Sequence, residues 1–101
     1  MNDQTYNGWT NYATWRVNLE MIDSDYWIEV INEHYQLPEL HEFEVVIREF
    51  YFKQVDQTVV ADSLASSLAY EFLDQVDWRD IARHILKEAS YLFETIGGKV
   101  T

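Results

Sequence analysis

The chain has no cysteine, a single proline and only three glycines among its 101 residues. The lack of cysteine excludes disulfides, thiolate nucleophiles and zinc–thiolate sites. Because proline and glycine usually interrupt regular structure, their scarcity favours long, continuous secondary-structure elements.

Two further absences concern membranes. No apolar run approaches the roughly 20 residues that a membrane-spanning helix requires. The first residues, Met1 to Gln4, lack the basic and then apolar layout of a secretory signal peptide. We therefore expect a cytoplasmic protein that does not act at a membrane.

Basic residues are also scarce, since 7 lysines and arginines stand against 18 aspartates and glutamates, for a formal net charge of −11. Long-range electrostatics would repel such a chain from nucleic acids and from anionic membranes. We therefore expect basic partners and no direct binding of nucleic acid. The hydrophobic content of 48% is enough to form a core, and the length fits one domain over residues 1–101.

Apolar side chains recur every three or four residues, which predicts an all-α fold, a compact bundle of four to five helices. Residues 1–9 are expected to form an irregular leader around Asn7-Gly8. The predicted helices cover about 10–22, from the cap at Asp23-Ser24-Asp25 to about Tyr35, from Pro38 onward, about 57–75, and from the cap at Asp77 to Gly97-Gly98.

Each predicted helix carries one apolar stripe. The stripes are Tyr12, Trp15, Leu19 and Ile22; Trp27, Ile28 and Ile31; Leu40, Phe43, Ile47 and Phe50; Ala61, Leu64, Ala65, Leu68 and Phe72; and Trp78, Ile81, Ala82, Ile85, Ala89, Phe93 and Ile96. From these stripes we predict that the core contains Trp15, Leu68, Phe72, Trp78, Ile81 and Ile85.

Residues 43–60 allow an alternative interpretation, a short β-hairpin, because 43–47 alternate in polarity and 57–60 contain β-branched residues. Two acid–base pairs spaced four apart, Glu44 with Arg48 and Glu49 with Lys53, favour a helix instead.

Motifs of enzymes are missing. The chain has no nucleophile elbow, phosphate loop, H-E-x-x-H pattern or dinucleotide fingerprint. Asp80, His84 and Glu88 occupy successive helical turns and could hold a metal, but such a row is more often a solvated face. We expect neither catalysis, nor a cofactor, nor a metal site.

The strongest functional pattern is a run of eight carboxylates, with no lysine or arginine, between Arg16 and Arg48. Glu20 and Glu44 are expected to be neutralised by those two arginines. The predicted partner-binding residues are Asp25, Glu29, Glu33, Glu39 and Glu42. Secondary candidates are Asp23, Glu20, Trp9, Asp62, Glu71 and Asp74. The alternative interpretation of this charge is a solvated face that keeps the protein soluble.

Four aromatic residues, Tyr6, Trp9, Tyr12 and Trp15, lie close together near the N-terminus. They could anchor the leader on the bundle and close its core. Alternatively, they could form an exposed aromatic anchor of an interface, since tryptophan and tyrosine are frequent hot spots.

Two blocks of the sequence resemble a group of small proteins encoded by phages, plasmids and other mobile elements. The first block is the pattern N-G-W-x-N-Y-x-T-W over residues 7–15, followed by Val17-Asn18-Leu19-Glu20. The second covers residues 72–82, from Phe72 to Ala82. The resemblance implies an origin in mobile elements, whose small acidic proteins often act as anti-CRISPR or anti-restriction proteins.

The sequence therefore predicts a counter-defence inhibitor in the cytoplasm of a bacterial host. It would bind a basic, nucleic-acid-binding surface of a host defence protein or complex, with its carboxylates imitating the phosphates of DNA. The alternative is a protein–protein adaptor or regulator of a mobile element that binds through the aromatic N-terminal motif.

Overall fold

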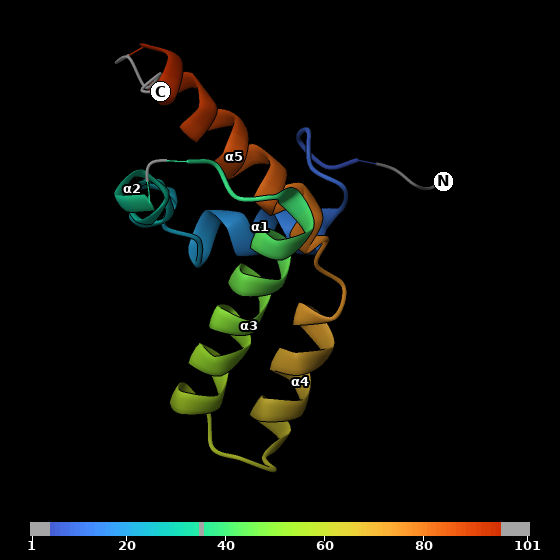
Figure 1. Ribbon diagram of the computed structural model, residues 1–101. Coiled ribbons are helices and arrows are strands. Elements are labelled where there is room, and N and C mark those ends of the chain that lie inside the picture. Colours follow the sequence, from blue (N-terminus) through green and yellow to red (C-terminus); the bar gives the residue numbers. More distant parts are fainter. Residues whose placement is uncertain (1–4, 35, 96–101) are drawn as a thin grey trace.

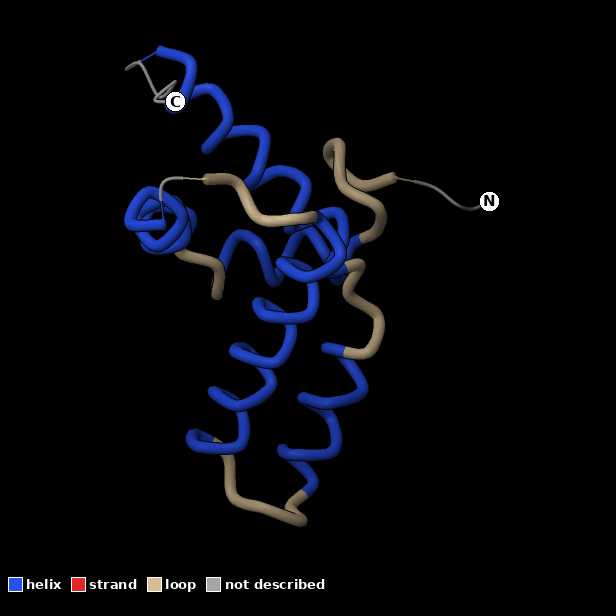
Figure 2. Tube along the Cα trace, in the orientation of Figure 1, coloured by secondary structure: helices blue, strands red, loops and turns tan. Residues whose placement is uncertain are grey.

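The computed structural model describes residues 5–34 and 36–95, which fold into five α-helices joined by short connections (Figures 1 and 2). The helices are α1 (Tyr12–Glu20), α2 (Ser24–His34), α3 (Leu40–Thr58), α4 (Leu64–Leu73) and α5 (Trp78–Thr95). The all-α prediction is confirmed. The alternative hairpin at 43–60 is wrong, because α3 continues to Thr58 and the described residues contain no strand beyond one isolated bridge.

Polar side chains set most helix starts. Asn11, Glu39 and Ser63 accept hydrogen bonds from backbone amides of the first turns of α1, α3 and α4. Asp77 does the same for α5, as predicted, because its Oδ1 accepts from the Asp80 amide at 3.1 Å. Asp23 Oδ1 likewise accepts from the Tyr26 amide in α2.

The fourth helix begins later than predicted. Its expected start at 57 lies inside α3, and the connection at 59–63 contains Asp62 with φ of 61°. Ser63 then caps α4 by accepting from the Ser66 amide at 3.0 Å. The predicted end of α5 at Gly97-Gly98 lies outside the described residues.

The core is centred on α5, which packs against α1, α2 and α3. Trp78, Ile81 and Ile85 are buried, as predicted. Trp27, buried in α2, donates through Nε1 to the hydroxyl of Tyr51 in α3 at 2.9 Å, so this buried polar pair is satisfied. The predicted inward residues of α2, Trp27, Ile28 and Ile31, are all buried.

Two predicted stripes are wrong in part. In α4, Leu68 is 55% exposed and Leu64 is 74% exposed, because α4 contacts the protein through another side, with only Leu73 buried. In α1, Leu19 is 61% exposed, and the buried face consists of Ala13, Thr14 and Val17.

Other members of the predicted stripes lie between these extremes. Trp15 and Phe72 are half-buried, whereas Tyr12 and Ala61 are exposed. The side chain of Phe93 and the whole of Ile96 lie outside the described residues.

The helices form a body and an arm. Figure 1 shows α3 and α4 side by side as a hairpin that extends away from α1, α2 and α5, while α2 is seen nearly end-on. The molecule measures 49 × 35 × 20 Å along its principal axes. None of the described helices combines the length and the apolar character that crossing a bilayer would need.

Candidate interaction surfaces

Three of the predicted partner-binding carboxylates, Asp25, Glu29 and Glu33, lie on one side of α2 and are exposed. A helix turns by about 100° per residue, so these positions lie opposite the buried Trp27 and Ile31. The acidic stripe of α2 therefore points away from the core.

The other two, Glu39 and Glu42, lie at the start of α3. Glu39 caps the helix, accepting from the Glu42 amide at 3.1 Å, so it also has a structural role. Glu42 lines a groove between α2 and α3, whose other wall includes Val30 and His34. Because Val30 and His34 lie on a different side of α2 from the acidic stripe, the five carboxylates form two neighbouring groups.

The arginines with a described contact bind groups other than these five carboxylates. Arg16 donates to Glu20, as predicted. Glu44 pairs with Arg79 at 3.1 Å. The prediction that Arg48 neutralises Glu44 is therefore wrong, and the guanidinium of Arg48 lies 5.0 Å from the ring centre of Phe52, where the two are attracted.

The five predicted carboxylates make no ion pair within the described residues. The described ion pairs involve only Glu20, Glu44 and Asp80 as acids. Among the described residues, no ion pair therefore compensates the negative charge of these five carboxylates.

The titration of Arg16 is changed by its neighbours. Its guanidinium donates to the carboxylate of Glu20 and to the hydroxyl of Tyr12, and these contacts raise the pKa of Arg16 above its ordinary value. Arg16 therefore remains a cation, bound to Glu20.

The secondary candidates are scattered. Trp9 is half-buried and stacks on His84, with ring centres 3.9 Å apart, so it anchors the leader. Asp23 and Asp74 lie at helix ends, and Glu20 forms an ion pair with Arg16. Asp62 and Glu71 are exposed near and on α4.

The Asn7-Gly8 pair makes a tight turn in the leader. Tyr6 and Trp9 exchange two backbone hydrogen bonds of 2.7 and 2.8 Å across it. Asn7 and Gly8 both have positive φ, 49° and 88°, as a two-residue hairpin turn of this kind requires. The turn places Trp9 against α5.

Beyond the turn, α1 is fixed by a buried threonine. Thr14 is fully buried, and its hydroxyl donates to Asn11 Oδ1 at 2.7 Å and accepts from the Asp77 amide at 2.8 Å. Asn11 Nδ2 donates to the carbonyl of Gln75 at 2.9 Å. These bonds attach the start of α1 to the connection before α5.

A buried carboxylate completes this network. Asp80 is only 6% exposed, and its Oδ2 accepts from the amide and hydroxyl of Thr10 at 2.9 and 2.8 Å. Arg83 and His84 approach Oδ1 at 3.5 and 3.4 Å. The row of Asp80, His84 and Glu88 is therefore not the fully solvated face that we had expected, because Asp80 is buried and bonded to Thr10. No group of three metal-ligating side chains occurs among the described residues.

The network joins two segments that are distant in sequence, 7–15 and 72–82. Sequence analysis did not predict the roles of Thr10, Asn11 and Thr14, although Asn followed by Thr three positions later is compatible with a cap. The partner atoms lie more than sixty positions away along the chain, so spacing could not identify them.

Some aromatic side chains of the leader remain accessible. Tyr6 and Tyr12 are 39% and 42% exposed. Their rings lie 5.2 Å apart between centres, and each contacts Trp15. Tyr12 also meets the edge of Phe72 in α4. The leader therefore both anchors the chain and presents aromatic surface next to α4.

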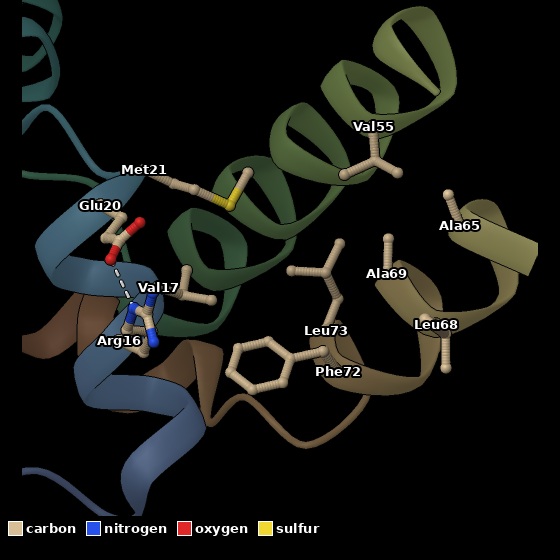
Figure 3. Close-up of a pocket in the computed structure, with 10 residues that line it drawn as sticks. All are labelled: Arg16, Val17, Glu20, Met21, Val55, Ala65, Leu68, Ala69, Phe72 and Leu73. Carbon is tan, nitrogen blue, oxygen red and sulfur yellow. Dashed lines mark hydrogen bonds and ion pairs between the residues drawn. The ribbon is translucent and has the colours of Figure 1, made fainter. Parts of the chain in front are cut away.

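Phe72 belongs to a further feature, an apolar groove of about 580 Å³ between α1, α3 and α4. Figure 3 shows side chains from all three helices around one hollow, with the Arg16–Glu20 pair at its edge. The lining residues are Arg16, Val17, Glu20, Met21, Val55, Ala65, Leu68, Ala69, Phe72 and Leu73. We refer to this feature as the α1–α3–α4 groove. From the sequence we had predicted Leu68 and Phe72, on the α4 side of this groove, as core residues.

Comparisons with known proteins add one result. No curated protein and no solved structure matches this chain. A family model described as a family of unknown function, DUF7249, matches residues 2–91. The match covers most of the chain, and the protein therefore belongs to DUF7249.

Proposed function

We propose that this protein is a non-catalytic counter-defence inhibitor of the anti-CRISPR or anti-restriction type. It would act in the cytoplasm of a bacterial host by binding a basic, nucleic-acid-binding surface of a defence protein. The observation that carries the proposal is the uncompensated charge of Asp25, Glu29, Glu33, Glu39 and Glu42, which are exposed and lack ion pairs among the described residues.

The physical basis is the charge density of DNA. Duplex DNA presents about one negative charge per 1.7 Å of its axis, and proteins bind it in positively charged grooves. Carboxylates fixed on helices can occupy such a groove without the entropy cost of ordering them on binding. An inhibitor of this kind needs no catalytic residues.

A charge-reversed variant, Glu29→Lys/Glu33→Lys, tests the proposal. The variant should keep its fold, because removing like charges four residues apart does not harm a helix. It should lose inhibition, because lysines facing a basic groove are repelled. Inhibition is measured as phage plating efficiency on hosts with active CRISPR–Cas or restriction systems, and the fold by circular dichroism.

The matched control is Glu49→Lys/Asp56→Lys, which makes the same change of net charge at exposed positions of α3. The control should inhibit as the wild type does. If the α2 variant folds and protects phage as well as this control does, the acidic stripe is not the binding site. Failure of the wild type to protect against any such system would overturn the inhibitor proposal itself.

A second candidate function is a mobile-element adaptor that binds through its aromatic N-terminal motif. The exposure of Tyr6 and Tyr12 favours it. Tyr12→Ala should then abolish capture of the partner, whereas added salt should weaken binding much less than it would for charge-led contacts.

A further inference from the structure

We infer that the α1–α3–α4 groove is a docking site for an amphipathic, basic helix of a partner protein. The inference goes beyond the proposed function, because the groove lies on α1, on α4 and on the second half of α3. The five carboxylates of the proposed function lie on α2 and at the start of α3.

The first argument is the exposed apolar surface. Every side chain that lines the groove is apolar except Arg16 and Glu20, and these two are bound to each other at its edge (Figure 3). Large continuous apolar surfaces are uncommon on monomers, and an exposed apolar groove is a frequent form of binding site. Leu68, more than half exposed, is the most accessible large apolar side chain of the lining.

The second argument is the shape of the apolar surface. Leu64, Leu68 and Phe72 follow one another at intervals of four along α4, so the stripe spans about two helical turns, roughly 12 Å, and ends one turn beyond Leu68. Leu64 is still more exposed than Leu68. A linear stripe beside a groove between helices matches the way an amphipathic helix inserts its apolar face. A helix laid there would pack against both members of the α3–α4 hairpin.

Charge complementarity indicates which kind of partner would bind in the groove. The segment 54–77, which contains the end of α3 and all of α4, carries five carboxylates and no lysine or arginine. On the α1 side, the cation of Arg16 is already held by Glu20. A helix with lysine or arginine beside its apolar face would therefore be attracted to this acidic segment, whereas a second copy of this chain, with its charge of −11, would be repelled.

The probe for a test is a synthetic amphipathic helical peptide with a leucine face and lysines on its other sides. Titrated into the full chain, it should shift the NMR methyl signals of Val55, Ala65 and Leu68. A peptide with glutamate in place of every lysine should bind at least about tenfold more weakly, because it faces like charges. Equal binding of both peptides, or shifts confined to other methyl groups, would overturn the inference.

Two leucine variants separate docking in the groove from general attraction to an acidic protein. Leu68→Gln should lower the affinity for the lysine peptide about tenfold, as expected when a leucine contact is lost. Leu19→Gln is the matched control, because Leu19 is also helical and more than half exposed but does not line the groove. The control should bind normally, and equal losses in the two variants would refute the site.

Sedimentation of the chain and peptide binding by charge-reversed variants test the inference further. If the chain sediments as a dimer and Leu68→Gln makes it a monomer, the groove accommodates a second copy and the inference is wrong. The Glu29→Lys/Glu33→Lys variant should weaken peptide binding less than Glu49→Lys/Asp56→Lys does, because Asp56 belongs to the acidic segment 54–77. That result would support the groove whether or not the acidic stripe inhibits a defence system, whereas a larger loss in the α2 variant would count against it.

Discussion

The helices α4 and α5 carry similar apolar periodicity, and the structure uses it in opposite ways. In α5, the stripe from Trp78 to Ala89 is buried against α1, α2 and α3. In α4, most of the stripe from Leu64 to Phe72 is exposed or lines an open groove. One helix is the centre of the core, whereas the other is the outer half of a hairpin that extends from it (Figure 1).

The difference shows what apolar spacing can and cannot establish. Spacing of three and four determines which side chains share a face of a helix. Whether that face is covered depends on how many other helices reach it. Three helices pack around α5, but α4 has only α3 and α1 as neighbours. An uncovered stripe in an otherwise well-packed chain is therefore a candidate interface.

The largest effect that tests this comparison is expected at Trp78. Trp78→Ala should lower the free energy of unfolding by about 3–5 kcal/mol, because it removes a large buried side chain from the centre of the core. The paired substitution Leu68→Ala in α4 should cost far less. Urea denaturation of both variants measures the difference, and similar losses would show that α4 is covered in solution.

A smaller effect is expected at the polar network that holds α1 to α5. Thr14→Val keeps the shape of the side chain but leaves the Asp77 amide without its acceptor. The expected loss of stability is about 1–3 kcal/mol, the cost of an unsatisfied buried polar group. Thr5→Val, at an exposed position, is the control and should change nothing. A Thr14 variant as stable as this control would refute the structural role of the network.

Hydrogen exchange should separate the two helices themselves. Amides in the middle of α4 should exchange at least about tenfold faster than those in the middle of α5, because fewer buried contacts resist local opening of the arm. NMR-detected exchange in deuterated buffer measures both sets at once. Equal protection would mean that the hairpin and the body open as one unit.

The smallest effect is expected at the tip of the exposed stripe. Leu64→Gln should change the stability of the free protein by no more than about 0.5 kcal/mol, since surface substitutions usually do little. Thermal melting of the purified chain is sufficient to measure it. A large destabilisation would indicate that Leu64 is covered and would remove the basis for an open groove.

Much of the fold could be predicted from local sequence. Trp27 and Ile31 in α2 and Ile81 and Ile85 in α5 lie on stripes whose period matches the helix, and all are buried. The cap at Asp77 and the tight turn at Asn7-Gly8 also follow from local chemistry. The start of α4 was placed too early, because the β-branched residues at 58–60 end α3 and form its connection.

The candidate surfaces could be predicted only in part. The carboxylates of α2 are exposed as expected, because a charge on the side opposite an apolar stripe faces water. Glu44 pairs with Arg79 and not with Arg48, because the approach of α5 to α3 brings in an arginine 35 positions away. Trp9 is an anchor on His84, whereas Tyr6 and Tyr12 remain accessible, a division that the cluster of aromatics did not reveal.

The sequence by itself determined the helical class, the faces of α2 and α5, the excess of negative charge and the caps at Asp23 and Asp77, because these depend on neighbours within a few residues. Tertiary structure decided which apolar faces are covered, which carboxylates keep a cation, and that residues 7–15 meet residues 72–82. Those outcomes depend on contacts between distant segments. The local interactions within a helix are the same whether its apolar stripe is buried or exposed. Only the packing of the whole chain decides between these two outcomes.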